Sequence, residues 1–255
     1  MTLLVNIIAV CTCILWLSVP AILNIICYPF SKKACVKISD YIVKVCAPGI
    51  FSVFKTYIKF NRTFTRETEK LPEQFFVISN HQSLLDIPIY MTFFPEYDVR
   101  FVAKDALARH IPLVSEMLRV QEHCLVPRKA KPMEAMRYVE EFGKKVVQRK
   151  QIPILFPEGS RTKDGNVGKF YSAGFRKLTE STGLPVVVCA LDGGYQLRDL
   201  RRIFTKLKCG SYRVNVLKIF DCPKTKEDCN EILEKARVLI QTQIEKWRKL
   251  PAQVR

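Results

Sequence analysis

A histidine and an aspartate lie five positions apart in the stretch 80–86 (NHQSLLD). These residue types can act together as a general base, because an imidazole accepts a proton near neutral pH when a carboxylate orients its ring. A separation of five is wrong for neighbours on one face of a helix. His81 and Asp86 can therefore pair only if His81 precedes a helix and folds back over its first turn.

The flanking sequence predicts that arrangement. An apolar, β-prone run, 75–79, ends directly before the stretch, and an apolar segment, 87–94, follows it. A strand therefore ends at His81 and a helix begins soon after, at the rim where α/β sheets place their chemistry. Structural roles explain the aspartate as well: it can close a capping box begun by Ser83, or be an N-cap itself with Pro88 in the first turn.

A second polar stretch, 156–162 (FPEGSRT), also follows an apolar, β-prone run. Its Glu158, Gly159 and Ser160 are typical of a tight turn. The backbone N–H groups of such a turn and the guanidinium of Arg161 can face an anion, and arginine binds phosphate through two parallel hydrogen bonds. An ordinary polar turn between a strand and a helix fits the same residues.

Two further basic residues, Lys104 and Arg128, stand at the ends of predicted strands. If those strands are parallel, their carboxyl ends meet at the same rim as His81. Each cation alone is typical of solvated surface. Together with Arg161 they predict an anion site beside the histidine.

The elements that must position these residues alternate along the chain from residue 75 onward. This alternation of β-prone runs and helical patterns predicts an α/β domain with a mainly parallel central sheet flanked by helices. The charged segment 61–74 is expected to be a connector. The expected strands are 75–79, 99–103, 123–126, 152–156, 184–191 and 212–220, and the expected helices are 84–94, 105–118, 132–149, 170–181 and 225–249.

An apolar segment precedes this domain. Residues 2–30 contain no charged side chain, and a helix of that length can cross a hydrocarbon core of about 30 Å. Asn6, Pro20 and Asn24 fit a kinked or partly inserted helix equally well. A cleavable signal peptide fits less well, because no basic region precedes the apolar run. Lys32 and Lys33 follow at once, which places that end on the cytoplasmic side.

Residues 34–60 have an amphipathic helical pattern, interrupted at Pro48 and Gly49. Such a helix suits the membrane interface and a packed core equally well. We therefore expect membrane-anchoring helices at 1–60 and the α/β domain at 61–255.

The formal net charge is +17. A charge of that size indicates an anionic partner, such as nucleic acid, a phospholipid surface or a phosphorylated substrate. The basic residues are dispersed and form no nucleic-acid-binding motif, so nucleic acid is not the expected partner. The ten cysteines include no C-x-x-C pair, and the three histidines do not cluster with them at ligand spacings. Neither a disulfide framework nor a metal site is expected.

The two polar stretches together resemble a known family. Stretch 80–86 is similar to the NHxxxxD motif of the glycerolipid acyltransferases, and 156–161 is similar to their FPEG-[ST]-R motif, in the same order. Weaker similarity covers the regions after Lys104, before Arg128 and at 184–188. Within that family the pattern resembles the 1-acyl-glycerol-3-phosphate acyltransferases.

This resemblance implies an O-acyltransferase at the cytoplasmic face of a membrane. The reaction would move an acyl chain from acyl-CoA or acyl-carrier protein to the sn-2 hydroxyl of 1-acyl-glycerol-3-phosphate (lysophosphatidate), giving phosphatidic acid. His81 would be the general base, and Asp86 would hold its tautomer and stabilise the imidazolium. The thioester donor is a co-substrate, and no other cofactor and no metal is implied.

The resemblance also implies how the acceptor is held. Arg161 and Lys104 would bind the phosphate of lysophosphatidate, with Arg128 a weaker candidate. The turn at the acyl acceptor would be formed by Glu158, Gly159 and Ser160, with its backbone N–H groups as candidate oxyanion donors.

Other functions remain open on the sequence alone. The acceptor could be glycerol-3-phosphate or another lysophospholipid. A membrane-anchored protein that binds anionic lipid without catalysis would carry the same charge. A hydrolase with Ser83 or Cys124 as nucleophile is the least supported, because neither lies in a G-x-S-x-G sequence.

Overall fold

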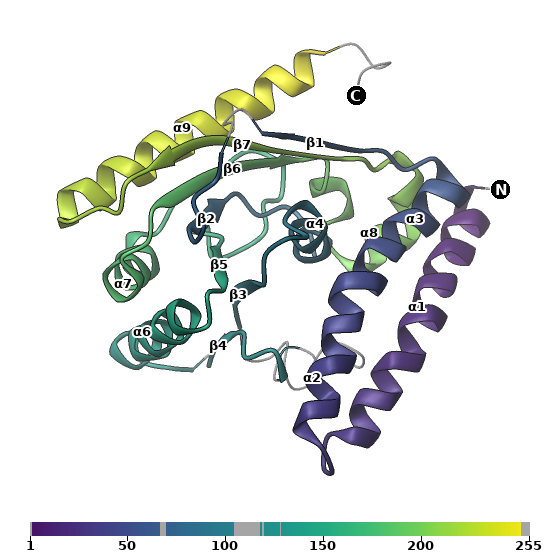
Figure 1. Cartoon of the computed structure of the whole chain (residues 1–255). Helices are drawn as coiled ribbons and strands as arrows, with labels where there is room; N and C mark the ends of the chain where they lie inside the picture. The colour runs from purple at the N-terminus through teal and green to yellow at the C-terminus, as the bar shows by residue number, and fades with distance from the viewer. Residues whose placement is uncertain (1, 67–69, 105–117, 119, 128, 251–255) are drawn as a thin grey trace.

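The computed structural model describes residues 2–66, 70–104, 118, 120–127 and 129–250. Within them, seven strands form one sheet in the order β1-β7-β6-β2-β5-β3-β4 (Figure 1). The strands are β1 (Arg62–Arg66), β2 (Phe76–Ser79), β3 (Val99–Lys104), β4 (Cys124–Val126), β5 (Ile152–Leu155), β6 (Val186–Asp192) and β7 (Tyr212–Phe220).

Helices surround this sheet, and short π or 3₁₀ turns (η) extend some of them. The α-helices are α1 (Thr2–Cys27), α2 (Lys32–Tyr41), α3 (Ala47–Ile58), α4 (Asp86–Phe93), α6 (Pro132–Gln148), α7 (Ser172–Thr182), α8 (Leu200–Lys206) and α9 (Lys226–Lys249). The turns are η1 (Ile42–Cys46), η3 (Tyr195–Leu197) and η4 (Leu207–Cys209).

Five neighbouring strands, β6, β2, β5, β3 and β4, run parallel, so their carboxyl ends meet at one edge of the sheet. Strand β7 runs antiparallel to β6, and the edge strand β1 is parallel to β7. The mainly parallel α/β fold expected from the sequence is confirmed. Because β7 is reversed, its first residue, Tyr212, lies at the edge where the parallel strands end.

Alternation of side chains along the strands divides the core into two layers. Phe76 and Ile78 of β2 belong to the layer of α6, α7 and α9, whereas Val77 belongs to the layer of α1, α3, α4 and α8 (Figure 1). In β6, Val186 and Val187 divide in the same way. Both faces are covered, and β2 and β6 are buried along their whole length, as is usual for parallel strands.

Helix α1 buries one stripe of side chains at helical spacing, which includes Ala9, Val10 and Cys13. The helix packs against α2, α3 and α8, and the stripe belongs to the same hydrophobic core as one face of the sheet. The other side of α1 exposes large apolar side chains such as Leu15 and Val19. By length and composition, α1 could cross a membrane.

The sequence predicts an interruption of the second helical segment at Pro48 and Gly49, but in the structure the segment continues through Pro48. A π-helical turn, η1, joins α2 to α3 just before this proline. Proline lacks the N–H that a regular helix would bond four residues back, and a local π turn accommodates that loss.

Two elements were not predicted. Strand β1 lies in the segment 61–74 that was expected to be a connector, and helix α8 lies between β6 and β7. Most side chains of β1 are exposed, so no apolar alternation marks it in the sequence. The expected helix at 105–118 falls outside the described residues, apart from residue 118.

Candidate active site

His81 and Asp86 face each other at the carboxyl edge of the sheet. His81 follows β2, Asp86 is the first residue of α4, and His81 Nδ1 lies 2.7 Å from Asp86 Oδ2. The Asp86 side chain is fully buried, whereas 19% of the His81 side chain is exposed. The capping box expected from Ser83 and Asp86 forms only in part. Asp86 Oδ2 accepts from the Ser83 N–H (2.9 Å), but Ser83 Oγ accepts from the Leu85 N–H (3.2 Å) and not from that of Asp86, and Leu85 is the N-cap of α4.

The Asp86 carboxylate is surrounded by hydrogen-bond donors. Its Oδ2 accepts from the backbone N–H groups of Gln82 (2.6 Å) and Ser83 (2.9 Å), and its Oδ1 accepts from the Tyr212 hydroxyl (2.9 Å). A carboxylate held by these donors can only accept from the imidazole, so the His81 proton lies on Nδ1. Nε2, the other ring nitrogen of this partly exposed side chain, then carries the lone pair that can accept a proton.

Sequence reasoning missed Tyr212. The residue begins β7, whose sequence is far from both motifs, and only the reversal of that strand brings it to Asp86. Tyr212 is fully buried. Burial, and then the negative charge of Asp86, raise the pKa of Tyr212 well above its ordinary value, so its hydroxyl remains a donor at neutral pH.

The raised pKa of Tyr212 predicts how the free energy of unfolding depends on pH. Unfolded tyrosine loses its proton from about pH 10, whereas the folded protein keeps it, so the free energy of unfolding should fall as pH rises above that value. In Tyr212→Phe this fall should be less steep by about 1.4 kcal/mol per pH unit. Denaturant titrations from neutral to alkaline pH measure the difference, and parallel curves for the two proteins would contradict it.

Residues of the second stretch, 156–162, contact His81 through its ring and its backbone. The His81 ring stacks on the Phe156 ring, with centroids 4.3 Å apart and planes 13° apart. The backbone N–H of His81 donates to Glu158 Oε1 (2.8 Å), and its carbonyl accepts from the Thr162 N–H (2.9 Å). These contacts fix the backbone and the ring of the histidine at the same time.

Glu158 joins two loops with its carboxylate. Its Oε2 accepts from the Gly168 N–H (2.9 Å), while Oε1 binds His81, and the residue is buried. Burial raises the pKa of Glu158, opposed by these two backbone hydrogen bonds. Gly159 adopts a positive φ of 64°, and its N–H donates to the Phe156 carbonyl (3.0 Å), which closes the turn. The Gly159 N–H is therefore already hydrogen-bonded within the protein.

The predicted cations are brought toward the same rim to different degrees. Arg161 is half-buried, donates from Nη1 to the carbonyl of Arg198, and directly precedes Thr162, which bonds to His81. Lys104 is the last residue of β3, so its backbone lies at the carboxyl edge. Arg128 lies outside the described residues. Among the described residues, no group of three or more His, Cys, Asp or Glu could hold a metal ion.

Two further residues of the first motif attach it to the end of β6. Asn80 pairs with the backbone of Leu191 through both its amide nitrogen (2.8 Å) and its oxygen (2.9 Å). Gln82 Oε1 accepts from the N–H of Gly194 (2.9 Å), and a Cβ at Gly194 would lie 2.3 Å from the Tyr212 hydroxyl. A glycine is needed there so that the chain can approach Tyr212.

The chain is similar in sequence to a known protein family. The sequence model of the family described as Acyltransferase matches residues 62–192. The 1-acyl-sn-glycerol-3-phosphate acyltransferase of Cocos nucifera is 32% identical over 116 residues, which are 46% of this chain and 36% of that protein. The protein of the same name from Limnanthes douglasii is 29% identical over 46% of this chain and 40% of its own length. The matched region thus covers less than half of these curated relatives.

A solved structure has the same fold over almost the whole chain. The 1-acyl-sn-glycerophosphate (LPA) acyltransferase PlsC from Thermotoga maritima superposes with a TM-score of 0.72 and covers 98% of both chains, at 22% identity.

Proposed function

The chain belongs to the acyltransferase family, and on that premise we propose that it transfers an acyl chain from a thioester donor to the sn-2 hydroxyl of 1-acyl-glycerol-3-phosphate, giving phosphatidic acid. The observation that carries the proposal is the 2.7 Å contact between His81 Nδ1 and a fully buried Asp86, which leaves Nε2 as a base at the rim. The similar proteins from Cocos nucifera and Limnanthes douglasii are both named 1-acyl-sn-glycerol-3-phosphate acyltransferase, which supports 1-acyl-glycerol-3-phosphate as the acceptor.

In this mechanism His81 Nε2 removes the proton from the acceptor hydroxyl as the oxygen attacks the thioester carbonyl. A carbon–oxygen bond forms, the carbon–sulfur bond breaks, and the departing thiolate recovers the proton from the imidazolium. Asp86 stabilises the imidazolium between these steps, as the acid of a serine-protease triad does. Proton and charge balance without a residue of the protein being acylated.

The hydrolase alternative lacks a nucleophile among its two candidates. The buried Ser83 hydroxyl donates to the Leu197 carbonyl and not to His81. Cys124 lies in β4, and burial raises the pKa of its thiol to about 12, so it carries no thiolate at neutral pH.

We assign the acceptor's phosphate to Arg161 and Lys104, with Arg128 as the weaker candidate. The position of Arg161 supports this assignment. Its neighbour Thr162 is hydrogen-bonded to the His81 carbonyl, which keeps the backbone of Arg161 close to the base. The turn formed by Glu158, Gly159 and Ser160 would lie against the acceptor. Gly159 and Ser160 are exposed, whereas the Glu158 carboxylate is already bonded to two backbone N–H groups.

Arg161→Lys should weaken acceptor use while keeping the positive charge. Lysine cannot form the two parallel hydrogen bonds of a guanidinium, and the kcat/KM for lysophosphatidate should fall about 10- to 100-fold. Steady-state kinetics on mixed micelles measure this value. The matched control is Lys163→Met, which removes an exposed cation two positions away; an equal loss in both variants would mean that general charge, and not a bound phosphate, is involved.

We further propose that residues 1–60 hold the enzyme at the cytoplasmic face of a membrane. The exposed apolar side of α1 and the lysines that follow it support this placement. Moving an acyl chain from bilayer to water costs about 0.8 kcal/mol per CH₂, so an enzyme at the interface avoids most of that cost.

The deciding experiment supplies purified protein with lysophosphatidate and either acyl-CoA or acyl-carrier protein, and measures phosphatidic acid. Formation of product with one of these donors is expected. Glycerol-3-phosphate and lysophosphatidylcholine are assayed beside it as acceptors. Faster use of either would overturn the proposed acceptor, and no thioester-dependent product with any acceptor would overturn the reaction.

A further inference from the structure

We propose that Arg248, in the last turn of α9, is a positioning residue for the acyl-transfer site. It holds the loop 162–166 against the end of β6 and, through Gln82, maintains the relative position of His81 and Asp86. This inference rests on the proposed function, because positioning is measured as turnover.

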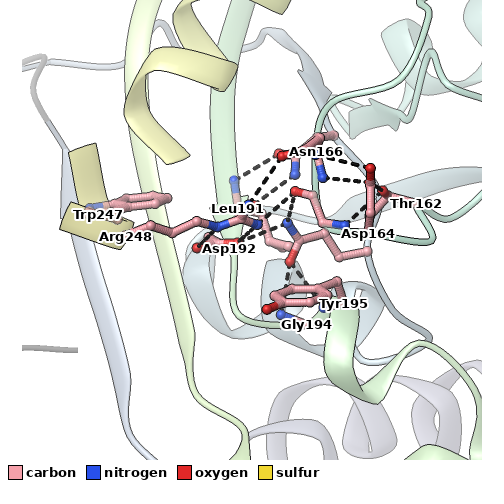
Figure 2. Close-up of polar contacts among 12 residues, drawn as sticks. Thr162, Asp164, Asn166, Leu191, Asp192, Gly194, Tyr195, Trp247 and Arg248 are labelled. Carbon is pink, nitrogen blue, oxygen red and sulfur yellow. Dashed lines mark hydrogen bonds and ion pairs between the residues drawn. The ribbon is translucent and has the colours of Figure 1, made fainter. Parts of the chain in front are cut away.

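Arg248 forms hydrogen bonds with two separate segments near the site (Figure 2). Its Nη2 and Nε bind the Asp192 carboxylate at 2.9 and 3.3 Å. The same Nη2 donates to the Gly165 carbonyl (2.8 Å), and Nη1 donates to Asn166 Oδ1 (3.3 Å). One guanidinium therefore joins the end of β6 to the loop that continues the second motif.

The first connection to the base passes through Gln82. Asp192 Oδ1, which binds Arg248, also accepts from Gln82 Nε2 (3.1 Å). The backbone N–H of that glutamine donates to Asp86 Oδ2 (2.6 Å), the oxygen that faces the imidazole. A shift of Asp192 would therefore be passed on to the carboxylate that orients His81.

The second connection passes through the loop. The N–H of Gly165 donates to Thr162 Oγ1 (3.1 Å), and the N–H of Thr162 donates to the His81 carbonyl (2.9 Å). Asp164 Oδ1 accepts from Thr162 Oγ1 and from the Asn166 N–H, both at 3.0 Å, which links the residues of the loop to one another. The clamp by Arg248 thus reaches the histidine from a second side.

The surroundings are shaped for this guanidinium. Gly165 has a φ of +89°, and a Cβ there would lie 2.5 Å from Arg248 Nη2, so only glycine admits the contact. The guanidinium also lies over the Tyr195 ring, 5.2 Å from its centroid. The Asp192 side chain is only 11% exposed, and ion pairs shielded from water are screened less than surface pairs. The pair is therefore suited to fix geometry.

The test compares Arg248→Met and Arg248→Lys with Arg237→Met, an arginine on the same helix that pairs with Glu234 of that helix. A misplacement of about 1 Å costs on the order of 100-fold in rate, so Arg248→Met should lower kcat about 10- to 100-fold with little change in KM. Arg248→Lys should recover part of the loss through the Asp192 pair. Arg237→Met should keep the wild-type kcat.

A second variant separates positioning from stability. Arg248→Met leaves the buried Asp192 without its cation, which destabilises the fold; Arg248→Met with Asp192→Asn removes that charge and should restore the melting temperature. If the inference is right, kcat stays low in this double variant because loop 162–166 is still unclamped. Recovery of kcat together with the melting temperature would overturn it.

Imidazole NMR gives a readout that does not depend on turnover. The chain has three histidines, so His81→Ala identifies the His81 signals. Arg248→Met should shift or broaden the Nδ1–H resonance, and Arg237→Met should not. An unchanged resonance with unchanged kcat would reject Arg248 while leaving the function standing. A wild-type protein without acyl transfer would reject the function, even if the resonance shifts.

Discussion

His81→Ala is expected to lower kcat about 10²- to 10⁴-fold, the range that a positioned general base supplies. An alcohol is a poor nucleophile, and the described residues offer no other imidazole against Asp86. The lone remaining path is attack by an unassisted hydroxyl. KM for lysophosphatidate should change little, because the phosphate contacts assigned to Arg161 do not involve the ring.

The His81→Ala variant should fold. Asp86 keeps three donors, from Gln82, Ser83 and Tyr212, so no buried carboxylate is left unsatisfied. The loss of stacking on Phe156 costs about 0.5–1.5 kcal/mol. Acyl transfer is measured together with the melting temperature and membrane attachment, with Arg237→Met, which removes an arginine that pairs with Glu234 on α9, as control. A variant that retains more than about a tenth of the wild-type kcat would remove His81 from the role of base.

The part of the site that could be predicted is the part formed by residues close together in the sequence. The stretches 80–86 and 156–162 each carry their own strand-to-turn signal, and the parallel sheet brings them to one edge. Residues that complete the site come from elsewhere. Tyr212 reaches Asp86 across 126 positions and Arg248 reaches Asp192 across 56. Nothing in the neighbouring sequence of either residue marks these long-range contacts.

The missed elements of the fold have a related cause. Strand β1 is identified by its pairing with β7, from Arg62 opposite Tyr212 to Arg66 opposite Val216, and its own side chains are largely exposed. A pattern of burial cannot reveal an element that buries little.

The role of Glu158 shows what the resemblance alone does not reveal. The resemblance implies that Glu158 belongs to a turn at the acyl acceptor, and in the structure its buried carboxylate also joins the His81 N–H to the Gly168 N–H. The second motif thus acts first as a support for the first one. Of the three turn residues, Gly159 and Ser160 are exposed, whereas Glu158 is buried.

Asp86→Asn is expected to lower kcat about 10³-fold while the hydrogen-bond geometry around residue 86 is retained. Two backbone N–H groups, of Gln82 and Ser83, face Oδ2, and they can only pair with an oxygen. The asparagine oxygen must therefore occupy that position, where it still accepts from His81 Nδ1, and its amide nitrogen can donate to the Tyr212 hydroxyl. The tautomer is kept, so the loss is that of a negative charge beside the imidazolium.

The size of that loss follows from the electrostatics. Two unit charges about 4 Å apart interact by about 4 kcal/mol at an effective dielectric constant near 20, and 1.36 kcal/mol corresponds to about tenfold in rate. Rates and melting temperatures of Asp86→Asn are compared with those of Asp86→Ala, which also leaves the two N–H groups and Tyr212 without an acceptor. Asp86→Asn should therefore be the more stable variant while remaining nearly as inactive. Near-wild-type turnover in Asp86→Asn would mean that Asp86 only supports the turn, and that the charge beside His81 has no part in the reaction.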